Sequence, residues 1–134
     1  MVNQPKKPTP FAKFLGIHKL GSFDQEKKEY TLKVSPNKKM VNFFPTLHGG
    51  YLSALFDDFF GMLVYFMYGI NTATTKKTIV EYERMIRIRQ REPLIFLVYF
   101  IEENNGVIFM KGEVKRGEQI MATTESQWRL RKNR

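Results

Sequence analysis

Residues 42–50 read Asn-Phe-Phe-Pro-Thr-Leu-His-Gly-Gly. They combine polar side chains with two adjacent glycines, whose backbone is not shielded by side chains. Two adjacent glycines at the start of a helix let a ligand approach the backbone closely and leave N–H groups pointing outward. Such donors, helped by the helix dipole, can polarise a carbonyl group and stabilise the negative charge that develops on it. The alternative is a plain glycine-rich start of a helix, in which the ring of His48 satisfies a local backbone group.

Two neighbouring carboxylates, Asp57 and Asp58, interrupt the apolar sequence that follows. A carboxylate among apolar residues is costly unless it is partnered or solvated, which makes each a candidate general base. The alternative is that both mark one solvent-facing stripe of a helix. Small or polar residues line up at helical spacing along one narrow stripe: Ser53, Ala54, Asp57 and Gly61. We therefore expect another element to approach that face closely.

A long, largely apolar helix is predicted at Gly49–Tyr68 to carry these groups. Apolar side chains recur there at three- and four-residue steps: Leu52, Leu55, Phe56, Phe59, Leu63, Phe66 and Met67. The strongly apolar part, residues 59–70, is shorter than the roughly 20 residues that span a bilayer. We expect a buried central helix and not a membrane anchor.

Strand patterns occur on both sides of this helix. Before it, residues 11–15 have the spacing of a short helical turn, and residues 29–34 alternate polar and apolar side chains. After it, strands are predicted at residues 77–89, 94–103, 106–116 and 118–130, and the last three form a meander through tight turns. This order predicts an α+β domain in which a curved antiparallel sheet of five to six strands wraps the helix.

Composition limits the classes of protein that fit. A chain of 134 residues has the size of one domain. With no cysteine and two histidines, we expect neither disulfides nor a metal site. A formal net charge of +9 indicates attraction to nucleic acid, an anionic membrane or a phosphate-rich cofactor. Aromatic residues fall mainly on the predicted helix and core strands, which argues against nucleic acid.

The two ends of the chain differ in composition from its middle. Residues 1–10 carry three prolines and two lysines and are expected to form a flexible tail; residues 11–130 form the domain and residues 131–134 a basic tail. The N-terminal segment lacks the apolar core of a secretory signal. We expect a cytoplasmic protein, with an organelle as the alternative.

These motifs together resemble the hotdog-fold thioesterases of the phenylacetate-pathway (PaaI-like) type and the thioesterase superfamily members. The resemblance covers about residues 11–130 and is carried by Asn42, Leu47-His48-Gly49-Gly50, Asp57 and a strand that opens Thr78-Ile79-Val80. It implies a single hotdog domain and an acyl-CoA thioesterase, a hydrolase of fatty acid metabolism that releases a free acid and coenzyme A. No cofactor is implied beyond the coenzyme A of the substrate.

The resemblance also implies a role for each of these positions. Asn42 would position the thioester or water, the Gly49 N–H would polarise the thioester carbonyl, and Asp57 would activate or replace a water nucleophile. His48 would support the site, and Thr78 matches the Ser or Thr position that helps to hold the water. Asp57 and Thr78 would come from the opposite subunit to Asn42 and Gly49, which requires a homodimer, often paired into a homotetramer. If the helix began one residue later, Asp58 would be the base.

The surroundings of the site are less defined by the sequence. Arg87, Arg89 and Arg91 alternate along a predicted strand and could form a cationic rim for the phosphates of coenzyme A. The alternative is an exposed, charged strand that protects a sheet edge from aggregation. Aromatic residues near the site could shape an apolar acyl pocket for fatty or aromatic acyl groups: Phe43, Phe44, Tyr51, Phe59 and Phe60. The charged stretch after Val80 departs from the apolar alternation usual in the family.

Two other functions fit the same scaffold. One is a non-catalytic protein that binds or senses acyl-CoA, and the other is a hydratase or dehydratase of enoyl thioesters. Tight binding without turnover would favour the first. Loss of a double bond without release of a thiol would favour the second.

Overall fold

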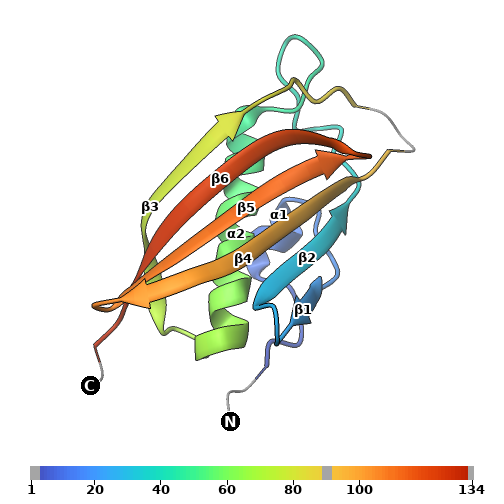
Figure 1. Cartoon of the computed structure of the whole chain (residues 1–134). Helices are drawn as coiled ribbons and strands as arrows, with labels where there is room; N and C mark the ends of the chain where they lie inside the picture. Colours follow the sequence, from blue (N-terminus) through green and yellow to red (C-terminus); the bar gives the residue numbers. More distant parts are fainter. Residues whose placement is uncertain (1–3, 89–91, 133–134) are drawn as a thin grey trace.

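The computed structural model describes residues 4–88 and 92–132. Helices and strands follow in this order: α1 (Pro10–Phe14), β1 (Ser22–Asp24), β2 (Glu29–Val34), α2 (Gly49–Tyr68), β3 (Ala73–Tyr82), β4 (Leu94–Asn104), β5 (Val107–Arg116) and β6 (Gln119–Leu130). The predicted α+β class is confirmed, and the bounds of α2 and β2 agree with those predicted from hydrophobic spacing. Figure 1 shows the strands lying across the long helix.

The strands form one antiparallel sheet in the order β1-β2-β4-β5-β6-β3. The predicted meander of β4, β5 and β6 is therefore confirmed. Its turns use left-handed backbone at Asn105 (φ 51°) and Gly106 (φ 79°), and again at Gly117 (φ 58°). Asn and Gly adopt such angles at low cost, which is why this pair signals a hairpin.

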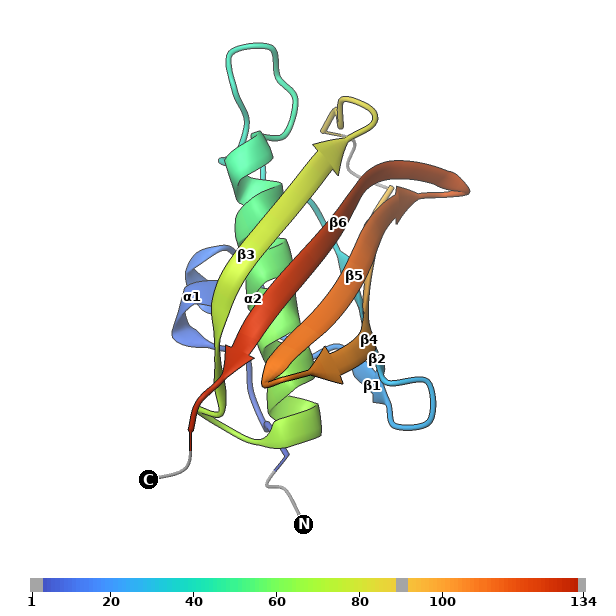
Figure 2. The same ribbon diagram turned by 60° about the vertical axis from the view of Figure 1, so that its left-hand side comes forward.

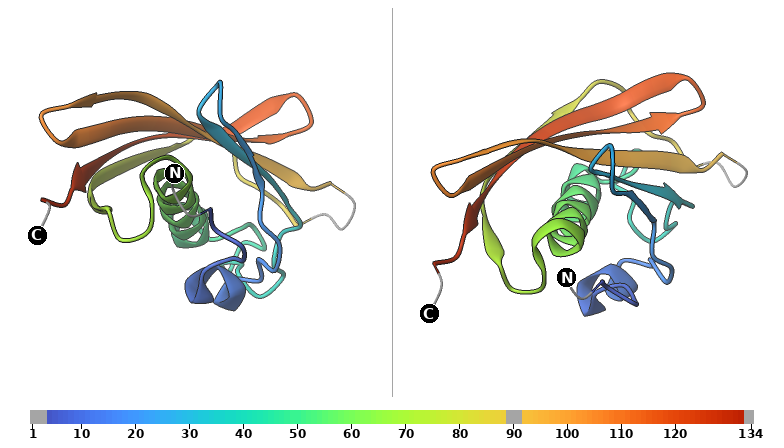
Figure 3. Two further views of the ribbon diagram at one scale, coloured as in Figure 1. Left: turned by 90° about the horizontal axis from the view of Figure 1, so that it is seen from below. Right: turned by 60° about the horizontal axis from the view of Figure 1, so that its bottom comes forward.

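The core lies between α2 and the concave face of the sheet, which curls over the helix (Figures 2 and 3). Phe56 and Phe59 of α2 both pack edge-on against Phe96 of β4, with ring centroids 5.1 Å apart in each pair. Burying each ring contributes roughly 1.5–3 kcal/mol, so this row of aromatic residues fixes the helix against the sheet. No helix in the described part of the chain has the length and apolarity needed to cross a membrane.

The bounds predicted for the strand at residues 77–89 are wrong at both ends, because β3 spans Ala73–Tyr82. The ladder with β6 ends where the N–H groups of Glu83 and Arg84 both donate to the Met121 carbonyl, at 2.9 and 3.1 Å. The chain then leaves the sheet, so the expectation that Arg87 lies on a strand face was also wrong. Arg89 and Arg91 lie outside the described residues.

Candidate active site

The loop of residues 41–48 is built around the side chain of Asn42. Its amide oxygen accepts hydrogen bonds from the Phe44 N–H (2.9 Å), the Thr46 N–H (3.3 Å) and the Thr46 hydroxyl (3.0 Å). The loop is closed by the Asn42 N–H, which donates to the Thr46 carbonyl at 2.9 Å. The oxygen of Asn42 is therefore committed to the loop, and its NH₂ group is the part that can meet a ligand.

His48 caps the N-terminus of α2. This agrees with the alternative in which its ring satisfies a local backbone group. Its Nδ1 accepts a hydrogen bond from the Gly50 N–H at 3.2 Å, and its own backbone N–H donates to the Met40 carbonyl at 2.8 Å. Because Nδ1 is the acceptor, a neutral His48 ring carries its proton on Nε2. The cap and the two glycines start the helix at the predicted residue.

Gly49 is approached closely by Tyr82 of β3. The Tyr82 hydroxyl donates to the Gly49 carbonyl at 2.8 Å and lies 2.6 Å from the Ser53 hydroxyl. A Cβ at position 49 would lie 3.2 Å from the Tyr82 ring, so a larger residue would force the ring to move. The Gly49 N–H donates no hydrogen bond to any described residue and belongs to the first turn, where helix N–H groups are free to bind a ligand.

Asp57 lies two turns further along the same face of α2. The Thr75 hydroxyl of β3 donates to its Oδ1 at 2.9 Å. Next on this face, a Cβ at Gly61 would lie 3.2 Å from the Trp128 ring of β6. The expectation that another element closely approaches this stripe of small residues is confirmed, since β3 and β6 do so.

Thr78 lies in a different hydrogen-bond group. Its hydroxyl is 2.7 Å from that of the buried Ser126, which also accepts from the Trp128 indole N–H at 3.0 Å. Thr75, and not Thr78, is the residue that the structure joins to Asp57 within one chain. A β-bulge between Thr75 and Lys77 sets which threonine meets the helix, and nothing in the sequence marks that bulge.

Asp58 has a partner on another element. The Thr9 hydroxyl donates to its Oδ1 at 2.6 Å, while Thr9 itself accepts from the Ala12 N–H at 2.9 Å as the N-cap of α1. Burial raises the pKa of Asp58; the hydrogen bond from Thr9 lowers it and the nearby charge of Asp57 raises it. Asp58 therefore links α1 to α2, whereas Asp57 faces the β3 side of the helix.

The aromatic residues expected to shape an acyl pocket divide into two groups. Tyr51, Phe59 and Phe60 are fully buried in the core of the chain. Phe43 and Phe44, at the tip of the 41–48 loop, are exposed. The buried three fill the core of the domain, and the loop pair is the part of this set that is exposed.

The separation of Gly49 and Asp57 limits what one chain can do. At a rise of about 1.5 Å per residue, the eight residue steps from Gly49 to Asp57 amount to about 12 Å along the helix axis. A carbonyl polarised at Gly49 and a water activated at Asp57 must meet at about 3–3.5 Å. The two groups of a single chain cannot act on the same carbonyl carbon.

Neither a protein-family model nor a curated protein sequence matches the chain. Solved structures do. A putative thioesterase, a phenylacetic acid degradation-related protein of Ralstonia eutropha, is 20% identical with a TM-score of 0.78, covering 91% of both chains. A mutant of the phenylacetic acid degradation protein PaaI of Thermus thermophilus is 18% identical with a TM-score of 0.78, covering 92% of this chain and 100% of that one. The chain has the hotdog fold.

A third similar structure contains a bound ligand. This Streptococcus mutans protein, bound to acetyl CoA, is 17% identical with a TM-score of 0.72, over 84% of this chain and 87% of that one. The resemblance drawn from the sequence is thus confirmed for the fold. Within the hotdog domain, Asn42 and His48 lie on the 41–48 loop and Gly49 and Asp57 lie on α2, where Thr75 of β3 contacts Asp57.

Proposed function

We propose that this hotdog protein is an acyl-CoA thioesterase, which hydrolyses an acyl-CoA thioester to a free acid and coenzyme A. The observation that carries the proposal is the partly buried Asp57, oriented by Thr75 on the helix that begins at Gly49, whose N–H forms no hydrogen bond with the described residues. A carboxylate held in this way is suited to act as a base. The likeness to a putative thioesterase and to a protein bound to acetyl CoA supports the same reaction.

Each of these groups has a defined role in the reaction. The Gly49 N–H and the NH₂ group of Asn42 donate to the thioester oxygen. Asp57 removes a proton from water as the water oxygen attacks the carbonyl carbon, and Thr75 holds the carboxylate. When the tetrahedral intermediate collapses, the C–S bond breaks and the sulfur takes the proton from Asp57. Asp57 as a direct nucleophile, through an anhydride, is the variant of this mechanism.

Two copies of the chain would complete each site. Gly49 and Asn42 of one copy would meet Asp57 of the other, because the two groups of one chain lie about 12 Å apart. The free edge of β3 and the exposed Phe43 and Phe44 are the surfaces that such a homodimer would cover. Two dimers would form the homotetramer. In this proposal Thr78, whose hydroxyl lies 2.7 Å from that of Ser126, would belong to the same subunit's half of the site as Asp57.

The test is release of free thiol from short, long and aromatic acyl-CoAs by the wild type and by Asp57→Asn. Losing a general base lowers kcat about 100- to 10,000-fold. Asp58→Asn is the matched control, because it makes the same chemical change one residue away and should keep most of the activity. Acyl-CoA binding without turnover by the wild type would instead indicate a sensor, and double-bond chemistry without thiol release would indicate a hydratase.

A further inference from the structure

A basic pocket is lined by residues from the start of β4, the β5–β6 turn and the segment after β3. These parts of the chain lie at the end of the molecule that carries the 41–48 loop (Figure 1). Its volume is about 710 Å³. The described residues that give it charge are Lys33, Arg84, Arg87, Arg116 and Glu92. Four cations face one carboxylate, so the pocket suits a ligand with several negative charges better than a single carboxylate.

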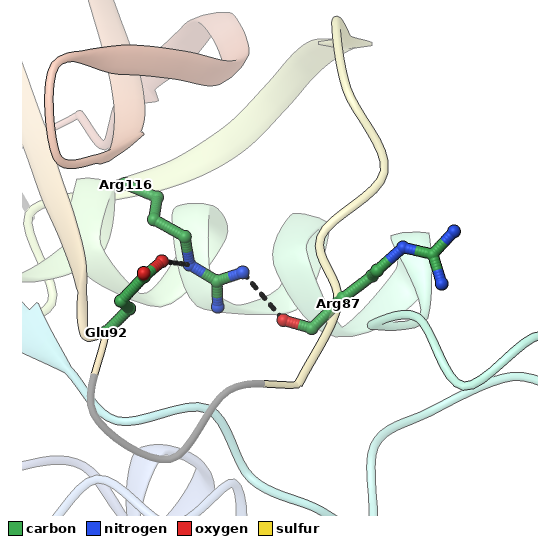
Figure 4. Close-up of polar contacts among 3 residues, drawn as sticks. All are labelled: Arg87, Glu92 and Arg116. Atoms are coloured by element: carbon green, nitrogen blue, oxygen red, sulfur yellow. Dashed lines mark hydrogen bonds and ion pairs between the residues drawn. The ribbon is translucent and has the colours of Figure 1, made fainter.

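Arg116 is the fixed part of this pocket (Figure 4). Its side chain is 9% exposed, its Nη1 donates to the Arg87 carbonyl at 2.6 Å, and its Nε lies 3.6 Å from a Glu92 oxygen. The carboxylate of Glu92 thus offsets the buried guanidinium, as a buried charge requires. Arg116 therefore links Arg87 to Glu92 and stabilises this wall of the pocket.

Three cations remain to meet a ligand. Lys33, Arg84 and Arg87 are exposed and form no ion pair with the described residues. In Figure 4 the Arg87 guanidinium extends away from Arg116 and Glu92. The guanidinium groups of Arg84 and Arg87 have the planar donor geometry that binds phosphate oxygens in pairs.

The pocket is joined directly to the candidate active site. The Leu47 N–H donates to the Ile86 carbonyl at 2.7 Å, and Thr46 pairs with Arg87 in a β-bridge. The loop that presents Asn42 therefore shares hydrogen bonds with the segment that presents Arg84 and Arg87. A ligand with its thioester at Gly49 can extend along this segment to place a charged end in the pocket.

We propose that the basic pocket binds the phosphorylated nucleotide end of coenzyme A, and that it makes the protein selective for thioesters that carry this nucleotide. The inference rests on the proposed thioesterase function. Concave shape favours a small polyanion, since a flat basic patch is what an acidic carrier protein or a nucleic acid would need. The pocket is thus a specificity element distinct from the groups that act on the thioester.

The first test is binding of adenosine 3′,5′-bisphosphate, measured by calorimetry, because it needs no turnover. The variant Lys33→Gln/Arg84→Gln should bind roughly tenfold more weakly than the wild type, and the affinity of the wild type should fall as salt increases. The control Lys111→Gln/Arg129→Gln removes one lysine and one arginine from exposed positions on β5 and β6 outside the pocket. Equal weakening in both variants, or none in the first, would overturn the inference.

The second test compares acyl-CoA with the same acyl group on pantetheine. The pocket variant should raise KM for acyl-CoA roughly tenfold, with kcat unchanged and with pantetheine turnover at the wild-type level. If no substrate releases thiol, the proposed function fails, while the calorimetry still decides the pocket. Preference for an acyl group on an acidic carrier protein, together with no binding of the bisphosphate, would refute the pocket and leave the thioesterase in place.

Discussion

At the scale of single residues, the two adjacent aspartates of α2 illustrate how neighbours in sequence acquire separate roles. Successive residues of a helix point about 100° apart, so Asp57 and Asp58 cannot share a partner. Asp57 meets Thr75 of the sheet, and Asp58 meets Thr9 at the cap of α1. One carboxylate faces the sheet, where we propose that it acts on a substrate, and the other links a short helix to the domain.

The raised pKa of Asp58 predicts a pH-dependent stability. Since the folded state holds this proton more tightly than the unfolded chain, the contribution of Asp58 is fully favourable below the unfolded pKa of about 4 and is lost as pH rises through the folded pKa. Asp58→Asn keeps an oxygen for Thr9 and cannot ionise. Its unfolding free energy relative to wild type should therefore increase across that pH range, measured by urea denaturation at several pH values. A constant difference would contradict this role.

At the scale of elements, the ends of a helix or strand could be predicted where nearby residues set them, and could not where a distant strand sets them. The bounds of α2 are encoded in its own residues: the cap at His48, Gly49-Gly50 at the start and Gly69 at the end, so spacing alone located them. The end of β3 depends on where its ladder with β6 stops, and that is decided by Met121, far away in sequence. The contacts of Thr75 and Tyr82 with α2 depend on the same distant pairing and could not be predicted from the sequence, whereas Asn42, His48, Gly49 and Asp57 could be proposed as site residues from their spacing.

The centre of the sheet sets a second prediction. A Cβ at Gly112 of β5 would lie 2.8 Å from Val98 Cγ1 and 2.9 Å from the Leu97 carbonyl oxygen, both on β4. Gly112→Ala should therefore push strands apart and lower the unfolding free energy by about 1–3 kcal/mol. Gly50→Ala is the control, because its nearest neighbour would be His48 Nδ1 at 3.4 Å, an ordinary contact. Urea denaturation of both variants distinguishes crowding from a general intolerance of alanine.

At the scale of the whole molecule, a site shared between two copies predicts complementation. Asn42→Ala and Asp57→Asn should each be inactive alone. In a mixed dimer, one of the two sites would combine an intact Asn42 with an intact Asp57, so equal mixing should restore about a quarter of wild-type activity. The measurement is thiol release after co-expression or subunit exchange. A mixture that stays inactive while hybrid dimers are present would assign both residues to a site within one chain.

The β4–β5 turn at Asn105 and Gly106 lies at the end of the domain opposite the 41–48 loop (Figure 1). The chain has no cysteine, so a cysteine placed beside this turn, at the exposed Asn104, would be the sole thiol in the protein. A fluorophore or spin label attached there would lie at the opposite end of the domain from the 41–48 loop. In any assembly of two copies, the distance between the two labels would report how the subunits are arranged. A change in that distance on adding substrate would show whether the subunits move.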